Sequence, residues 1–287
     1  MRDRELLRNF LLMAVVLTAA SLLFSSGCKS TEAAPSQQEL QKLVSDAVVA
    51  GGQASTYKVD LNMTMAIKAS SGNETNQGEF TTIIKSENDR SARKSHVNFY
   101  MSSVITSGGR PSSSNLSIEM YVFPDFMYAK RTTQWTKQPY REEAVTPGAN
   151  ELDQHLALLK SVYDLKFLRY ETLDSSDYYV VEMTPDSVLA TSWFLKHSIF
   201  GVDSDPDKES KNLKRITYTA WIDKKTMLLK KVDLVFGFEM DAQTPDADTA
   251  DVNMTMNIND YNIPLSIALP PEATDTLQPP PNMLPKP

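Results

Sequence analysis

The longest uninterrupted alternation in this chain lies over residues 57–68, and it restricts the fold more than any other feature. Apolar side chains occupy every second position from Tyr57 to Ile67, and polar or small residues stand between them. A repeat of two residues over this length predicts a long β-strand with one buried face and one solvated face. Such a strand needs partners with the same pattern, so the chain is expected to build a sheet.

Shorter alternating segments, separated by turn residues, predict the partner strands. They lie near 79–87, 94–106, 116–123, 126–131, 134–138, 165–172, 177–184, 212–223, 226–240 and 252–258. Helices are expected over 37–49, 149–161 and 186–200. The first helix has apolar residues at helical spacing, a capping box of Ser36 and Glu39, and Gly51-Gly52 as its end.

These elements predict an α+β fold, in which one large, curved antiparallel sheet carries a few helices on one face. No charge run, composition break or repeat divides residues 37–275, which we therefore expect to form a single domain. Residues 28–36 are small and polar and predict a flexible tether. Residues 276–287 are rich in proline and predict an extended or disordered tail.

The N-terminus has the pattern of a secretory signal, which predicts that residues 1–27 are removed. Three arginines precede an apolar run from Phe10 to Phe24, and Ser25-Ser26-Gly27-Cys28 follows. These last residues resemble the lipobox of bacterial lipoproteins, although Ser25 stands where Leu or Val is usual. The resemblance implies a diacylglycerol on Cys28 and an extracytoplasmic protein that this lipid anchors to the cell membrane. A plain secretory signal with an unrelated cysteine, or an uncleaved anchor, are the alternatives.

Several function classes are disfavoured by composition and by missing motifs. The net charge is −7, whereas a nucleic-acid-binding protein is expected to present a basic face. His96, His155 and His197 have no neighbour at metal-ligand spacing, and no phosphate-binding, dinucleotide-binding or serine-hydrolase motif occurs. We therefore predict a protein without metal, cofactor, nucleic-acid partner or enzymatic activity.

Methionine is the residue type that suggests a function. Ten of the 13 methionines fall in predicted strands, mostly on the apolar positions of the alternation. Because methionine is unbranched and polarizable, it suits surfaces that accept several apolar shapes. The inner face of the sheet could then enclose an apolar cavity, with Trp193 and Phe194 of the third helix as a lid. Ordinary gap filling in a solid core, with this helix packed on the sheet, explains the same residues.

Three short motifs extend the argument to a known family. The segments MYVFPDFMYAKRTTQWTK, WIDKKTMLLKKVDLVF and SIALPPEA resemble two hairpins and a closing Leu-Pro-Pro motif of LolA-like envelope carriers, including lipoproteins of the LppX/LprG type. The resemblance covers most of residues 37–275. It implies a half-barrel of antiparallel strands, plugged by helices, that binds acyl chains, and it implies no catalytic residues.

We thus predict a monomeric, membrane-tethered lipoprotein that binds a hydrophobic ligand, with lipid acyl chains as the favoured ligand. The alternative is an envelope sensor or scaffold with a solid core. The residues expected to line the cavity are Leu61, Met63, Met65, Ile67, Met101, Met120, Val122, Phe236, Met254 and Met256.

Overall fold

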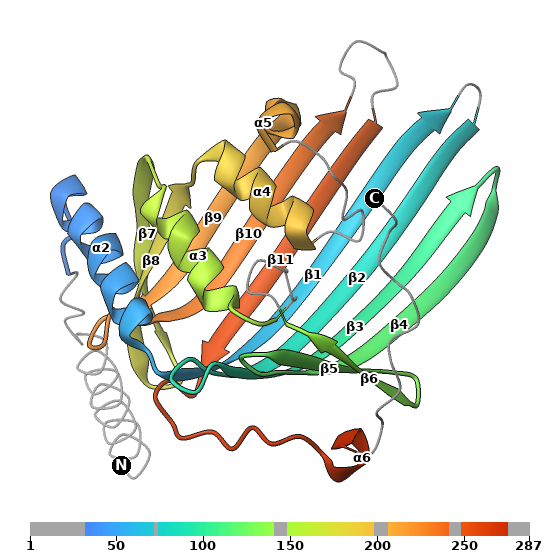
Figure 1. The fold of residues 1–287 in the computed structure, drawn as a ribbon. Coiled ribbons are helices and arrows are strands. Elements are labelled where there is room, and N and C mark those ends of the chain that lie inside the picture. The colour runs from blue at the N-terminus through green and yellow to red at the C-terminus, as the bar shows by residue number, and fades with distance from the viewer. Residues whose placement is uncertain (1–31, 72–73, 141–147, 198–205, 241–247, 275–287) are drawn as a thin grey trace, which may run out of the picture. The chain divides into compact units, whose positions relative to one another are not determined.

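The computed structural model describes residues 32–71, 74–140, 148–197, 206–240 and 248–274 (Figure 1). Residues from Pro35 onward form one compact unit. The predicted signal peptide, Cys28 and the predicted tail at 276–287 lie outside the described residues.

Eleven strands form the bulk of the described chain. They are β1 (Thr56–Ser71), β2 (Glu74–Asp89), β3 (Lys94–Ser107), β4 (Arg110–Val122), β5 (Phe126–Arg131), β6 (Gln134–Pro139), β7 (Asp164–Leu173), β8 (Ser176–Thr184), β9 (Leu213–Asp223), β10 (Leu229–Met240) and β11 (Asp248–Asn259). The helices are α2 (Gln37–Gln53), α3 (Glu151–Lys160), α4 (Ser187–His197), α5 (Pro206–Glu209) and α6 (Pro271–Thr274), with a 3₁₀ turn, η1, at Ser210–Asn212. Every predicted strand is present, but β2, β4 and β11 begin earlier than predicted. In β4 the first six residues are exposed and carry no apolar alternation.

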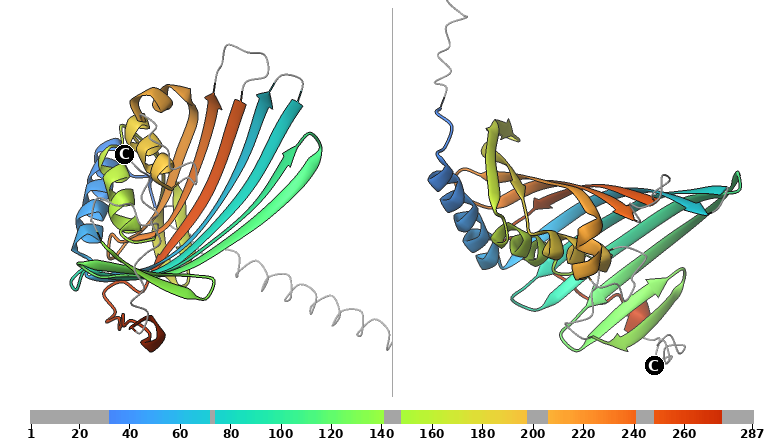
Figure 2. Two further views of the ribbon diagram at one scale, coloured as in Figure 1. Left: turned by 45° about the vertical axis from the view of Figure 1, so that its right-hand side comes forward. Right: turned by 90° about the horizontal axis from the view of Figure 1, so that it is seen from above.

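The strands form one antiparallel sheet in the order β6-β5-β4-β3-β2-β1-β11-β10-β9-β8-β7. Two meanders, β1–β6 and β7–β11, join through the pairing of β1 with β11 in the centre of the sheet. Among the described strands β6 and β7 remain as edges, so the sheet stays open. Figure 2 shows its curvature, with helices α2, α3 and α4 on one of its faces, which confirms the predicted half-barrel architecture.

Helix α2 begins where the sequence predicts but ends later. The Ser36 side chain accepts a hydrogen bond from the Glu39 amide, and the Glu39 carboxylate accepts one from the Ser36 amide, so the capping box is confirmed. The expectation that Gly51-Gly52 ends the helix is wrong, because the helix continues to Gln53. Gly51 instead permits a close approach between helices, since a Cβ atom there would lie 2.8 Å from Leu156 Cδ2 of α3.

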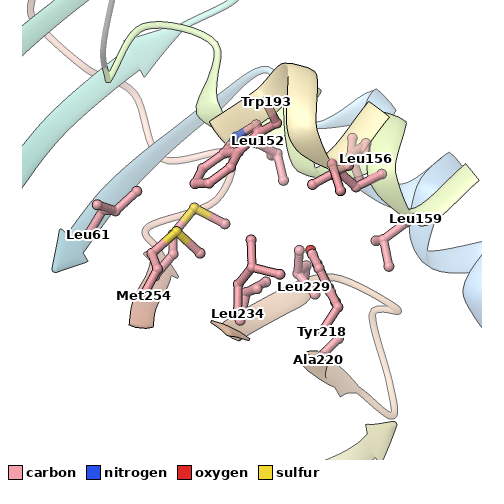
Figure 3. Close-up of a cluster of buried hydrophobic side chains, with 14 of the residues drawn as sticks. Leu61, Leu152, Leu156, Leu159, Trp193, Tyr218, Ala220, Leu229, Leu234 and Met254 are labelled. Atoms are coloured by element: carbon pink, nitrogen blue, oxygen red, sulfur yellow. The ribbon is translucent and has the colours of Figure 1, made fainter. Parts of the chain in front are cut away.

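The main core lies between the sheet and the helices α2, α3 and α4. Leu43 and Ala47 of α2, Leu152 and Leu159 of α3, and Trp193 of α4 are all buried in it. Figure 3 shows leucine and tryptophan side chains directed from the helices toward Met254, Leu234 and Leu229 of the sheet. The helices thus bury the apolar face that the strand alternation predicts.

A smaller cluster covers the opposite face of the sheet at β4–β6. Here Tyr121 and Trp135 pack with Ile267 and Ala273 of the chain that follows β11. These last two residues belong to the segment around the Leu-Pro-Pro motif, which runs below the sheet to α6 in Figure 1. The C-terminal segment therefore packs on the outer face of the sheet at β4–β6.

Candidate functional site

The face of the sheet that carries α2, α3 and α4, here called the inner face, holds every second residue of each strand. In β1 these are the odd-numbered residues from Tyr57 to Ile67. Met63, for example, lies opposite Met254 of β11 on one side and opposite Thr82 of β2 on the other. Residues directly opposite each other in neighbouring strands share a face, so the register defines which side chains the inner face holds.

All of the residues predicted to line a cavity lie on this inner face. Those that are buried are Leu61, Met63, Met65, Met120, Val122, Phe236, Met254 and Met256. Ile67 and Met101 are half-buried. The alternation therefore placed these residues on one face, and their contact with a ligand stays a prediction.

In some cross-strand rows of the inner face, burial decreases from the centre of the sheet toward β4, although Val97 of β3 and Met120 of β4 in a neighbouring row stay buried. One cross-strand row runs through Met256, Leu61 and Ile84, which are at most 3% exposed. It continues through Phe99 of β3 and Ile118 of β4, which are only half-buried. The helices thus cover the apolar face of β8–β11, β1 and part of β2, and the apolar residues continue beyond that cover.

We call the uncovered continuation the β3–β4 apolar strip, which consists of Phe99, Met101, Leu116 and Ile118. In this strip Phe99 lies opposite Ile118, and Met101 lies opposite Leu116. Of the four, the sequence prediction included only Met101. The alternation within 97–101 could have identified Phe99, and the alternation of 116–122, which gave Met120 and Val122, could also have identified Leu116 and Ile118.

The chain that enters α3 marks one border of this strip. Gly148 has a φ of +86°, and a Cβ atom there would lie 2.5 Å from Val97 Cγ1 and 2.7 Å from Ile84 Cγ2. The backbone at Gly148 therefore presses directly on the inner face of β2 and β3. The strip begins one inner-face position further along β3, at Phe99.

The two aromatic residues predicted as a lid pack against β10. The Trp193 ring stacks on Phe236 with centroids 6.0 Å apart, and the Phe194 ring stacks on Phe238 at 4.8 Å. Both α4 side chains are buried. In this structure they therefore pack on the sheet, and movement of α4 as a lid stays a prediction.

A buried polar group, which the sequence analysis did not identify, lies between α3 and β9. His155 is fully buried, and its Nδ1 lies 3.2 Å from the Tyr218 hydroxyl. The buried Glu151 carboxylate accepts a hydrogen bond of 2.9 Å from the Gly148 amide. Burial raises the pKa of Tyr218 well above its usual value, so its hydroxyl stays protonated. These contacts position α3 on the sheet.

Arg90 joins the ends of α2 and α3 near the turn between β2 and β3. Its guanidinium donates to the Gly51 carbonyl at 2.6 Å and to the Ala54 carbonyl at 3.2 Å. It also pairs with Asp153 of α3 at 2.5 Å. A polar groove of about 180 Å³ adjoins this contact. Because cations stabilise the carbonyl end of a helix, Arg90 serves as a cap for α2.

The part of the chain that the structure describes offers no centre for metal chemistry. No group of three or more His, Cys, Asp or Glu side chains is arranged there to hold a metal ion. None of the described helices is both long and apolar enough to cross a bilayer.

The sequence matches the family described as "Family of unknown function (DUF6612)" over residues 39–278. No curated protein matches it. Among solved structures the chain is similar to LprF from Mycobacterium bovis, at 16% identity and a TM-score of 0.48, covering 83% of this chain and 99% of that one. It is also similar to the lipoprotein LppX from Mycobacterium tuberculosis, at 11% identity and a TM-score of 0.43, covering 81% and 100%.

A third similar structure is a putative outer membrane lipoprotein-sorting protein domain from Vibrio parahaemolyticus. It shares 10% identity at a TM-score of 0.25, with 80% of this chain and 94% of that one covered. A lipoprotein of the LppX type, the type that the sequence motifs resemble, is among these similar structures.

Proposed function

We propose that this chain, which belongs to the DUF6612 family, binds the acyl chains of lipids along the β3–β4 apolar strip of its inner face. The observation that carries this proposal is the continuation of the apolar inner face beyond the helices. Phe99, Met101, Leu116 and Ile118 remain half-buried, although their strand neighbours toward the centre are covered. An apolar ligand that lies on the strip would complete their burial.

The strength of such binding follows from the area that a ligand would cover. Complete burial of a large apolar side chain contributes about 1.5–3 kcal/mol, so finishing four half-buried ones contributes roughly 3–6 kcal/mol. Each buried CH₂ of the ligand adds about 0.8 kcal/mol. Micromolar affinity requires about 8 kcal/mol after the cost of association. A long acyl chain therefore reaches useful affinity, and a short one does not.

The methionines next to the strip support a ligand of variable shape. Met63 and Met254 lie opposite each other in the centre of the inner face, and Met101 continues the same row beyond Thr82. A flexible thioether can change rotamer to accommodate a ligand more easily than a β-branched side chain can. The binding surface would extend from the strip toward Met63 when α4 moves away from the sheet.

Acylation of Cys28 would hold the β3–β4 apolar strip close to the membrane lipids that are its proposed ligands. The predicted tether spans residues 28–36, which reach at most about 30 Å when fully extended. The protein would then load from the extracytoplasmic surface of the cell membrane as a tethered monomer. Its partners would be membrane lipids and the hydrophobic ligand.

A matched pair of substitutions tests the proposal. Met101 and Ser102 are consecutive half-buried residues of β3 that lie on opposite faces. Met101→Glu puts a charge on the strip, whereas Ser102→Glu puts the same charge on the other face. We expect Met101→Glu to weaken binding of a fluorescent C16 fatty acid at least about tenfold, and Ser102→Glu to leave it unchanged. Thermal unfolding of both variants checks that each is folded, and equal affinities would refute the proposal.

The close packing at the centre of the sheet favours a second candidate, a non-transporting envelope sensor or scaffold with a solid core. Trp193 and Phe194 fill the space over β10 in the described structure. Native mass spectrometry of the protein, purified gently from membranes, separates the two functions. Lipid bound at one molecule per chain supports the carrier, and an unliganded mass without uptake of the fatty acid supports the scaffold.

A further inference from the structure

The outer face of the sheet, opposite the helices, contains an unusual band of uncharged polar residues. Two neighbouring cross-strand rows run through β11, β1, β2, β3 and β4. The first row is Thr255, Asn62, Ile83, Tyr100 and Ser117. The second row is Asn253, Thr64, Thr81, Ser102 and Asn115. We call these ten residues the outer polar band.

No member of the band is ionisable at neutral pH, although 23% of the chain is charged. Eight of the ten carry an amide or an aliphatic hydroxyl group. The rows on either side hold charges, with Asp60 opposite Lys85 on one side and Glu79 and Asp251 on the other. The band is therefore a neutral strip with charged borders, whereas an ordinary solvated face mixes charges throughout.

Two apolar side chains lie exposed in the middle of the band. Tyr100 and Ile83 are opposite each other in β3 and β2, and they are 39% and 36% exposed. At the β11 end, Asn62, Thr64, Asn253 and Thr255 of the band line an open hollow of about 360 Å³, which Asp233 and Val235 of β10 also line. Within the hollow, the Thr255 hydroxyl donates a hydrogen bond to the Asp233 carboxylate, and in the middle of the band the Tyr100 hydroxyl lies 3.5 Å from Asn115 Oδ1.

We propose that the outer polar band binds an uncharged polysaccharide strand that lies across β11–β4. Amide and hydroxyl groups both donate and accept hydrogen bonds, so they match the hydroxyl and acetamido groups of sugars. Tyr100 with Ile83 offers an apolar platform for the C–H face of a sugar ring. Five strands at a spacing of about 4.8 Å give a band of roughly 19 Å, which accommodates several sugar units.

The charge of the band separates this ligand from other polymers. Nucleic acids and acidic glycans need cationic contacts to their negative groups, and the band has none. The apolar area is confined to two residues, which is too little for a lipid chain. A neutral polymer with many hydroxyl groups loses no ion pairing on this surface and gains hydrogen bonds along its length.

The test uses the full chain in detergent micelles and isothermal titration with neutral hexasaccharides of N-acetylglucosamine and of glucose. We expect at least one of them to bind with a Kd below about 10 mM. Because no ion pairs take part, the affinity should change little between 0.1 M and 1 M NaCl. Tyr100→Ala should weaken binding at least about tenfold, whereas Tyr163→Ala, at a 74% exposed tyrosine outside the band, should not.

Asn62→Asp is the second variant, since it adds one charge to the band without removing a large side chain. It should also weaken binding, and thermal unfolding should show that both variants are folded. The proposal is overturned if neither hexasaccharide binds, if Tyr100→Ala and Asn62→Asp bind as the parent does, or if binding appears only for acidic polygalacturonate. Loss of lipid binding by Met101→Glu has no bearing on this result, because Met101 lies on the other face.

Discussion

Gly148 gives the sharpest prediction about how the helices are held on the sheet. Its φ of +86° is one that an alanine adopts at a cost of about 1–2 kcal/mol. The new Cβ atom would in addition lie 2.5 Å from Val97 Cγ1 and 2.7 Å from Ile84 Cγ2. Both neighbours are branched side chains in the sheet, where overpacking costs about 1–3 kcal/mol. We expect Gly148→Ala to lower the free energy of unfolding by about 2–5 kcal/mol.

Two other glycines provide the controls. Gly109 also has a positive φ, of +74°, but a Cβ atom there would meet nothing within 4 Å, so Gly109→Ala measures the backbone cost alone. Gly52 lies in α2 and also has open space around it, so Gly52→Ala should stabilise the protein by about 0.5–1 kcal/mol. Urea unfolding, followed by circular dichroism, gives the three values.

The reasoning is refuted if Gly148→Ala and Gly109→Ala destabilise the protein equally, because the close approach to Val97 would then contribute nothing. A double variant adds a second check. In a Val97→Ala background, where the nearest methyl group is absent, the further loss caused by Gly148→Ala should shrink by at least about 1 kcal/mol. An unchanged loss would show that the methyl contact is not the cause.

Three further predictions concern the helix cap, the alkaline limit and the anchor. Arg90→Ala should lower the free energy of unfolding by about 2–3 kcal/mol, because it removes the hydrogen bonds to two carbonyls at the end of α2 and the ion pair with Asp153. Urea unfolding checks this, with Arg93→Ala, at an exposed neighbouring arginine, as the control variant. Burial, and then the nearby Glu119 carboxylate, raise the pKa of Tyr121 to about 12. The stability that protonated Tyr121 contributes is therefore fully present below pH 10, the ordinary tyrosine pKa, and is lost as the pH rises from about 10 to 12. Tyr121→Phe should reduce that loss in urea titrations at pH 8–12. Cys28→Ser should abolish labelling by clickable palmitate in cells, and a parent chain that takes up no label would contradict the tether.

Local pattern predicted most of the secondary structure and the composition of the inner face. The odd-numbered residues of β1, from Tyr57 to Ile67, all lie on that face, because a two-residue repeat depends only on strand geometry. The capping box at Ser36 is local as well. The end of α2 was predicted wrongly because Gly51 is required for the close approach of Leu156 in another helix and does not end α2. No pattern within the α2 segment encodes that contact.

The extent of the candidate site could not be predicted for a related reason. Phe99 and Leu61 belong to strands with similar alternation, yet Leu61 is buried and Phe99 is only half-buried. The difference depends on which strands the helices cover, and this follows from the connections between the strands. The pairing of His155 with Tyr218 likewise joins α3 to a strand of the second meander.

The centre of the sheet shows how such a long-range pairing determines the character of both faces. Leu61 pairs with Met256 across about 200 residues of chain, so the two meanders meet only when β1 and β11 come together. That single pairing completes both faces at once, since Met63 and Met254 meet on the inner face while Asn62 and Thr255 meet on the outer face. A one-residue slip between β1 and β11 would bring asparagine and threonine under the helices and methionine into solvent. The alternation that identifies the strand therefore also fixes its register, and with it the separate character of an apolar inner surface and a neutral polar outer one.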